Sequence, residues 1–283
     1  MEARLAAAQP AIRAEIRIIK TTGDRAGTAS LASGESVGWF VREIEEELIA
    51  GGIDLAVHSL KDLPLVQPAG LIIAAIPARE DARDALVTRD GRGWEDLEPA
   101  ARIGTGSPRR VGQLKALRPE LKFEAIRGNV DTRLRKLAEG RVDALVLAMA
   151  GLNRLGLRRE AVHPLPFEVM LPAPGQGALA LEIRASDREL AGLIERSMND
   201  PESSATVRAE RAFLKSLGGG CQMPVGALGR ISGDALELTG VLAAPDGGRV
   251  LRDLMRGPAS QPEETGEALG RKMLDQGART LLS

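Results

Sequence analysis

The chain has 283 residues, one cysteine, two histidines and a formal net charge of −1. This charge gives no reason to expect nucleic acid or an anionic membrane as the main partner, and no apolar run is long enough to span a bilayer. One cysteine excludes an internal disulfide, and two scattered histidines predict no metal site. The length suggests two or three domains, and the absence of a signal-peptide pattern predicts a cytoplasmic protein.

Hydrophobic periodicity in the first part of the chain predicts two helices and three strands, at residues 2–8, 14–20, 41–50, 53–57 and 71–76. The segment at residues 58–64 directly follows the buried strand at 53–57. Because ligands of open α/β sheets bind beyond the carboxyl ends of strands, Lys61 and Asp62 are candidate site residues. A desolvated Asp can hold or deliver a proton and a Lys can hold an anion, whereas the alternative interpretation is a solvated turn.

The middle of the chain is basic, with 14 Arg and Lys against 5 Asp and Glu between residues 102 and 159. Residues 102–111 are predicted to form a strand, a tight turn and the start of a helix that runs to residue 117. Strands at 122–126 and 142–148, with a helix at 132–139 between them, continue the alternation. This alternation predicts a parallel sheet covered by helices on both faces. The excess positive charge indicates a cleft for an anionic small molecule, with a solvated arginine-rich surface as the alternative.

Two strand-to-helix junctions in this basic segment are candidate anion sites. Ser107 is predicted to cap the first helix, where unpaired N–H groups favour an anion. Arg109 and Arg110 add forked donors for carboxylate or phosphate, and Arg127 and Arg133 repeat the pattern at the next junction. Both classes of ligand stay open, although the glycine-rich motifs of nucleotide sites are absent.

The last part of the chain is predicted to contain a rigid turn, three strands and two helices, at residues 171–177, 178–183, 203–217, 236–243, 249–255 and 263–275. Residues 245–248 predict a hairpin between the last two strands. Cys221 follows three glycines, which allow backbone conformations closed to other residues. We expect a displayed nucleophile or covalent attachment point, with a buried structural cysteine as the alternative. Two α/β lobes and a small α+β domain are predicted.

Six stretches of the sequence resemble the porphobilinogen deaminase (hydroxymethylbilane synthase) family. They occur in the family's order and span residues 54–64, 104–110, 127–134, 147–156, 171–178 and 210–226. The resemblance implies two periplasmic-binding-protein-like α/β lobes and a C-terminal α+β domain that carries the cofactor cysteine. These parts are expected at residues 1–78 with 178–198, at 79–177 and at 199–283.

The resemblance also implies a function. Four porphobilinogen molecules would be polymerised head to tail into hydroxymethylbilane, with release of ammonia, in haem and chlorophyll biosynthesis. Cys221 would hold a dipyrromethane cofactor through a thioether, and Asp62 would protonate the departing amine and stabilise cationic ring nitrogens. Cofactor-binding positions match Lys61, Asp62, Ser107, Arg109 and Arg110. Carboxylate-binding positions for the substrate match Arg127, Arg133 and Arg154. The family pattern implies a monomer without nucleic-acid or membrane partners.

Two differences from the family pattern are expected to matter. The usual N-terminal strand and helix with a Gly-Thr-Arg-x-Ser-x-Leu-Ala motif is not found, so the first lobe is expected to be N-terminally truncated. Val37 stands where the family has a Lys. Two alternatives therefore stay open: a truncated or degenerate member that folds without turnover, and a small-anion-binding module.

Overall fold

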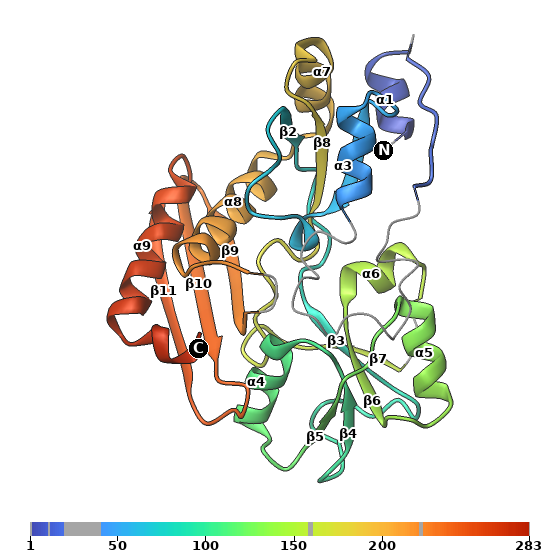
Figure 1. The fold of residues 1–283 in the computed structure, drawn as a ribbon. Coiled ribbons are helices and arrows are strands. Elements are labelled where there is room, and N and C mark those ends of the chain that lie inside the picture. The colour runs from blue at the N-terminus through green and yellow to red at the C-terminus, as the bar shows by residue number, and fades with distance from the viewer. Residues whose placement is uncertain (1, 11, 20–40, 158–160, 221–222, 283) are drawn as a thin grey trace. The chain divides into compact units, whose positions relative to one another are not determined.

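The computed structural model describes residues 2–10, 12–19, 41–157, 161–220 and 223–282. Its helices and strands confirm the predicted mixed α/β class (Figure 1). The chain forms two compact units, Met1–Arg79 with Ala178–Ala205 and Glu80–Gly177 with Thr206–Ser283. The expected division into three domains stays a prediction. None of the helices in this described part combines the length and apolar composition that crossing a bilayer requires.

The first unit is built on a three-stranded sheet of β1 (Leu55–Ser59), β8 (Leu179–Arg184) and β2 (Leu71–Ala75). Its helical elements are α1 (Glu2–Ala8), α3 (Arg42–Ile49), the 3-10 turn η1 (Leu60–Asp62) and α7 (Arg188–Met198). The central strand β8 is antiparallel to both neighbours. On one face Leu48 of α3 packs against Ala56 and Leu71. On the other, Leu181 packs against Ile194 of α7.

A five-stranded sheet with the order β5-β4-β6-β3-β7 lies in the second unit. Its strands are β3 (Asp84–Thr88), β4 (Arg102–Gly104), β5 (Lys122–Glu124), β6 (Ala144–Ala148) and β7 (Val162–Pro164). The parallel pairing expected for β5-β4-β6 is confirmed, but β3 is antiparallel to both β6 and β7. The sequence analysis did not predict the strand β3 itself.

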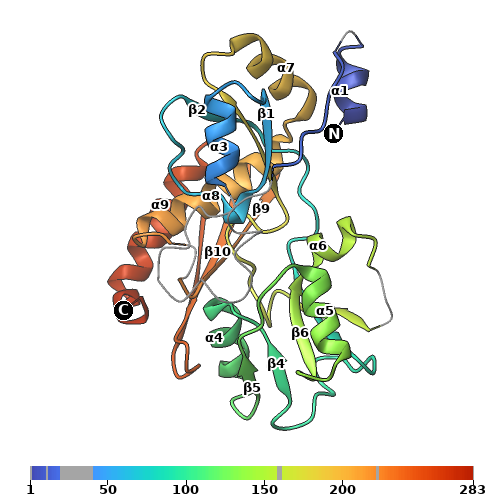
Figure 2. The same ribbon diagram turned by 45° about the vertical axis from the view of Figure 1, so that its right-hand side comes forward.

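Helices cover both faces of this sheet, as predicted. They are α4 (Pro108–Leu117), α5 (Val130–Ala138) and α6 (Met149–Arg154). Leu114 of α4 packs in one core with Ile103 of β4, whereas Leu137 of α5 and Leu152 of α6 pack in the core on the opposite face. Figure 2 shows α4 on one side of β4 and β6, with α5 on the other.

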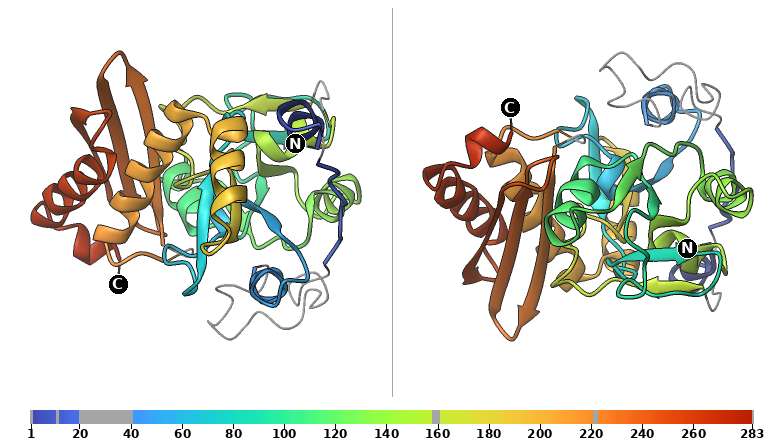
Figure 3. Two further views of the ribbon diagram at one scale, coloured as in Figure 1. Left: turned by 90° about the horizontal axis from the view of Figure 1, so that it is seen from above. Right: turned by 90° about the horizontal axis from the view of Figure 1, so that it is seen from below.

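The second unit also contains an antiparallel sheet with the order β11-β10-β9. The elements are α8 (Pro201–Ser216), which belongs to this unit from Thr206 onward, β9 (Val225–Ser232), β10 (Ala235–Ala243), β11 (Val250–Pro258), α9 (Pro262–Asp275) and η2 (Ala278–Leu281). The predicted hairpin is confirmed, with Ala243 opposite Val250. Phe213 of α8 and Leu269 of α9 pack on the same core, and Figure 3 shows α9 lying along this sheet.

One predicted strand is wrong within the described residues. Residues 14–19 form neither helix nor strand, although their β-branched alternation fits a strand. A strand needs a hydrogen-bonded neighbour, and no described segment pairs with these residues. Residue 20 and the glycine-rich loop expected at residues 23–34 lie outside the described residues.

Candidate active site

The turn that carries Lys61 and Asp62 follows β1 directly, as predicted. The residues on either side, Leu60 and Leu63, are buried, and the Leu60 N–H donates to the Ala178 carbonyl at 3.1 Å. Asp62 is exposed and Lys61 is partly buried. The first unit therefore presents the Asp62 carboxylate at its surface on a turn whose flanking side chains are fixed in the core.

The start of α4 carries the second group of candidates. Pro108 begins the helix, but the side chain of Ser107 makes no capping hydrogen bond, so this predicted cap is wrong. Instead the Ser107 N–H donates to the Thr105 hydroxyl at 3.2 Å. Arg109 and Arg110, in the first turn, are only 3% and 7% exposed. Their guanidinium groups therefore lie inside the second unit rather than on its solvated surface.

Both arginines pair with Asp84, the fully buried first residue of β3. Arg109 Nη1 lies 2.7 Å from Asp84 Oδ2, and Arg110 Nη2 lies 2.7 Å from Asp84 Oδ1. Burial lowers the pKa of the Arg109 guanidinium, the Asp84 charge raises it and Arg110 lowers it further. Because arginine stays protonated in proteins, these three side chains carry two positive charges and one negative charge. The cluster retains one positive charge that Asp84 does not balance.

Further hydrogen bonds fix this cluster in place. Arg109 Nη1 donates to the Leu171 carbonyl at 2.7 Å, and Gln176 Nε2 donates to Asp84 Oδ1 at 3.1 Å. The sequence analysis did not single out Asp84 or Gln176. One available signal was an acid at the head of an apolar run, because such a residue, once buried, needs a cationic partner.

The three predicted substrate arginines also lie in the second unit. Arg127 is exposed on a turn in which Gly128 takes a φ of +112°. Arg133 of α5 donates from Nε to the Gly128 carbonyl at 2.7 Å, so its side chain contacts the turn that carries Arg127. Arg154 is exposed at the end of α6, where its Nη2 donates to the Gly177 carbonyl at 2.8 Å.

Cys221, the predicted attachment point, lies outside the described residues, as does Val37. Before Cys221, the residues that follow α8 include Gly218 with a φ of +91° and Gly219 with a φ of +24°. These are conformations that side-chain-bearing residues rarely adopt, as expected from the run of three glycines. The approach to Cys221 is therefore a glycine turn between α8 and β9.

A buried acid, Glu210, connects α8 to two neighbouring segments of the second unit. Glu210 of α8 is fully buried and accepts hydrogen bonds from the Gly175 N–H at 2.7 Å and from the Gly229 N–H at 2.8 Å. Two amide donors compensate part of the cost of burying a carboxylate. Glu210 thereby joins α8 to the turn at residues 171–177 and to β9, a role that the sequence analysis did not predict.

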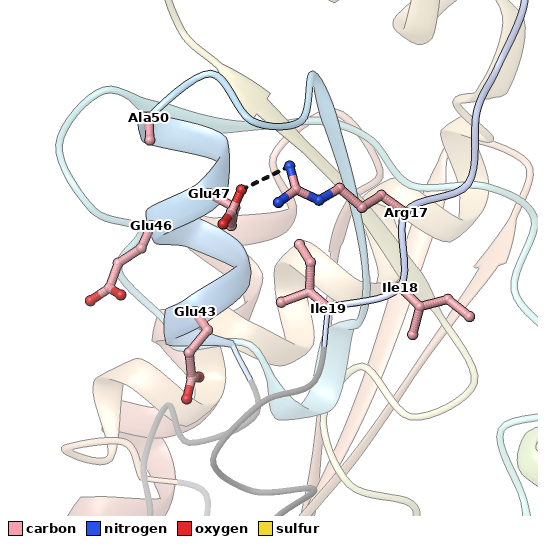
Figure 4. A pocket seen from close by; sticks show the side chains of 7 residues that line it. All are labelled: Arg17, Ile18, Ile19, Glu43, Glu46, Glu47 and Ala50. Atoms are coloured by element: carbon pink, nitrogen blue, oxygen red, sulfur yellow. Dashed lines mark ion pairs between the residues drawn. The ribbon is translucent and has the colours of Figure 1, made fainter.

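A pocket of about 450 Å³ in the first unit is separate from these candidates. It lies between α3 and residues 17–19. Figure 4 shows Arg17 directed toward Glu47, with 3.1 Å between Arg17 Nη1 and Glu47 Oε2. The lining residues are Arg17, Ile18, Ile19, Glu43, Glu46, Glu47 and Ala50. None of the predicted site residues lines it, so this pocket is not the candidate active site.

The two histidines lie on strands of different units. His58 of β1 is buried beside Glu182, whereas His163 is in β7. In the described part of the chain, no group of three or more His, Cys, Asp and Glu side chains is arranged to hold a metal ion.

Comparison with known families gives two sequence matches. The family model described as "Porphobilinogen deaminase, dipyromethane cofactor binding domain" matches residues 1–192. The model described as "Porphobilinogen deaminase, C-terminal domain" matches residues 204–275. Together they cover both units.

Curated relatives agree with these matches. The porphobilinogen deaminase of Syntrophobacter fumaroxidans is 43% identical over 282 residues, covering 100% of this chain and 91% of the relative. That of Roseiflexus sp. is 48% identical over 279 residues, covering 99% and 91%. Among solved structures, an ancestral cationic amino acid solute binding protein aligns with a TM-score of 0.42 and 16% identity, over 69% of this chain and 74% of that one. The family models and the sequence relatives show that this chain belongs to the porphobilinogen deaminase family, as its motifs predicted.

Proposed function

We propose that this chain is a hydroxymethylbilane synthase of tetrapyrrole biosynthesis, which joins four porphobilinogen molecules head to tail and releases ammonia at each addition. The observation that carries this is its identity of 43% and 48% with two porphobilinogen deaminases over 100% and 99% of its length. A small-anion-binding module would need neither a cysteine directly after three glycines in the sequence nor an acid at the end of β1.

Cys221 is the residue proposed to hold the dipyrromethane cofactor, through a thioether. The described residues fit an anionic group of this kind, because Arg109 and Arg110 carry one more positive charge than Asp84 balances. Ser107 at the start of α4 and Lys61 are proposed to complete the cofactor contacts. When bound, the dipyrromethane would prime the growing chain by supplying a terminal pyrrole with a free α-carbon.

Asp62 is the proposed catalytic acid. A proton on its carboxyl group would pass to the amine nitrogen of porphobilinogen as the carbon–nitrogen bond breaks, and the nitrogen would leave as ammonia. The resulting carboxylate would then face the positive charge that develops on the pyrrole ring and offset it. Exposure of Asp62 on a turn fixed by Leu60 and Leu63 supports this role, because the carboxylate is accessible and its backbone is anchored.

Arg127, Arg133 and Arg154 are proposed to bind the acetate and propionate groups of the substrate. Each presents a guanidinium group suited to a carboxylate, and Arg127 and Arg154 are exposed. The backbone hydrogen bonds of Arg133 and Arg154 fix part of each guanidinium in advance, which reduces the conformational entropy lost on binding. We also propose that the protein is a cytoplasmic monomer without nucleic-acid or membrane partners. Light scattering of the purified protein would test the monomeric state.

The intact mass of the purified chain beside Cys221→Ser tests the proposed function. We expect the wild-type chain to exceed its polypeptide mass by two linked pyrrole units, and Cys221→Ser to show the bare mass. Wild-type protein given porphobilinogen should then release ammonia and form hydroxymethylbilane. A bare wild-type mass that persists after incubation with porphobilinogen or preformed hydroxymethylbilane, together with no ammonia release, would overturn the proposal.

A further inference from the structure

A buried amide on α4, that of Gln113, contacts the turn at residues 171–177 in the second unit. Gln113 is 5% exposed, and Leu171, where the turn begins, is 1% exposed. The side-chain Oε1 accepts a hydrogen bond from the Leu171 N–H at 2.9 Å. The side-chain Nε2 donates to the Leu171 carbonyl at 3.1 Å and to the Arg109 carbonyl at 3.3 Å. One side chain therefore binds both backbone polar groups of Leu171, although 58 positions separate the two residues.

The partners of Gln113 fix the orientation of its amide. An amide oxygen can only accept a hydrogen bond, and an amide nitrogen can only donate one. The oxygen of Gln113 meets a backbone N–H, and the nitrogen meets carbonyl oxygens. The reversed orientation would lose these hydrogen bonds, and a carboxylate would place an acceptor against carbonyl oxygens. The position therefore favours an amide over an acid of the same size.

The Leu171 carbonyl connects Gln113 to a proposed cofactor ligand. Arg109 Nη1 donates to the same oxygen at 2.7 Å, and this nitrogen also lies 2.7 Å from Asp84 Oδ2. Gly226 of β9 packs closely on the carbonyl as well, because a Cβ there would lie 2.9 Å from its oxygen. The Leu171 carbonyl is thus held by α4 and restricted by β9, and it gives the Arg109 guanidinium an acceptor in a fixed place.

Asp84 alone does not define the orientation of Arg109. Its Oδ1 also accepts hydrogen bonds from Arg110 Nε at 2.9 Å and from Gln176 Nε2 at 3.1 Å. A single ion pair permits several orientations of a guanidinium group, whereas a second acceptor adds geometric specificity. For Arg109 that second acceptor is the Leu171 carbonyl. A guanidinium fixed in advance loses less conformational entropy when it binds a carboxylate.

We propose that Gln113 is a positioning residue, which acts through the Leu171 carbonyl on Arg109 and thereby on the carboxylates of the dipyrromethane. The inference rests on the proposed function, in which Arg109 binds the cofactor. Porphobilinogen carboxylates bind other arginines in that function, and the cofactor stays covalently attached. Displacement of Arg109 therefore slows the chemical steps without weakening substrate binding. Loss of the Gln113 amide should lower kcat and leave KM nearly unchanged.

Gln113→Met tests the proposal in the cofactor-loaded enzyme, because methionine is unbranched like glutamine but its thioether cannot donate a hydrogen bond. We expect kcat to fall about tenfold or more, since a displacement of about 1 Å can cost about 100-fold. The KM for porphobilinogen should stay within about twofold of the wild type.

Two control variants separate this effect from a general loss of hydrogen bonds or of stability. Gln276→Met also removes an amide hydrogen bond in the second unit, to Asp253 at 2.7 Å, but this side chain is exposed. Its kcat and KM should equal those of the wild type. Leu236→Ala removes a fully buried side chain from a core that does not include Leu171. It should lower the Tm while kcat and KM, measured well below the Tm, stay unchanged.

Two further measurements test the route through the Leu171 carbonyl. Gln113→Glu keeps an acceptor for the Leu171 N–H but loses the donor, so kcat should fall at least as far as in Gln113→Met. A double-mutant cycle of Gln113→Met and Arg109→Met, followed by urea unfolding, tests the coupling without any use of activity. If Gln113 acts on Arg109, the double variant should lose less stability than the two single losses together.

The proposal is overturned if kcat of Gln113→Met equals that of Leu236→Ala, or if KM rises while kcat stays unchanged. Wild-type kcat in Gln113→Glu would also refute it, because the donor end of the amide would then be dispensable. Additive losses in the cycle would show that Gln113 does not act on Arg109. Absence of turnover in the wild-type chain would instead refute the proposed function, and the unfolding cycle would still decide whether Gln113 and Arg109 are coupled.

Discussion

Asp84→Asn is expected to destabilise the second unit strongly. The carboxylate lies 2.7 Å from both Arg109 and Arg110, and none of the three residues is more than 7% exposed. Asparagine keeps the shape but removes the charge, so two buried guanidinium groups lose their counter-ion. Removing one partner of a buried pair costs about 3–5 kcal/mol, a large share of a stability of about 5–15 kcal/mol. At about 2–4 °C per kcal/mol for a unit of this size, the Tm should fall by about 6–20 °C.

Thermal unfolding followed by circular dichroism at neutral pH measures this difference. Asp90→Asn is the matched control, because Asp90 also pairs with an arginine, Arg92, at 2.9 Å but is 53% exposed. Solvent screening limits that pair to about 1 kcal/mol or less, so its Tm should move little. If Asp84→Asn unfolds within about 2 °C of the wild type, the reasoning is wrong, and the two arginines need no buried counter-charge.

Two further substitutions test the site and its supports. Asp62→Asn should lower turnover by about 100-fold or more while the Tm stays close to that of the wild type, because the side chain is exposed, and normal turnover would remove Asp62 from its proposed role. Gly177→Ala should destabilise the protein by about 1–3 kcal/mol in urea unfolding, since φ is +89° and a Cβ would lie 2.5 Å from the Glu80 carbonyl oxygen. An unchanged urea midpoint would mean that the turn relaxes without strain.

Features with local causes could be predicted from the sequence. The hairpin between β10 and β11 depends on Gly247, which takes a φ of +75°, and the start of α4 depends on Pro108. Lys61 and Asp62 could be placed at the end of β1 because a short apolar run ends directly before them. In each case neighbouring residues contain the whole signal.

Features that depend on distant pairings could not be predicted. Asp84 and Arg109 are 25 positions apart, and which strand lies beside α4 decides that they meet. The strand β3 was not predicted, and its antiparallel direction is set by its pairing with β6 and β7, which are far from it in the sequence. The segment at 14–19 has the pattern of a strand but lacks a described neighbour, so its pattern alone gave a wrong prediction. The amphipathic helix α7 and the strands β7 and β9 were not predicted either.

A buried carboxylate lies behind the proposed chemistry in each unit. In the second, Asp84 directs Arg109 and Arg110, and in the first, Glu182 contacts His58 on the strand that leads to Asp62. Apolar side chains could pack in many ways at similar cost, whereas a buried ion keeps its energy low only when each partner is in place. We infer that these carboxylates restrict the orientation of the site residues, at a cost in stability that apolar packing would not carry. Substituting them should therefore alter the order of the site as well as the Tm.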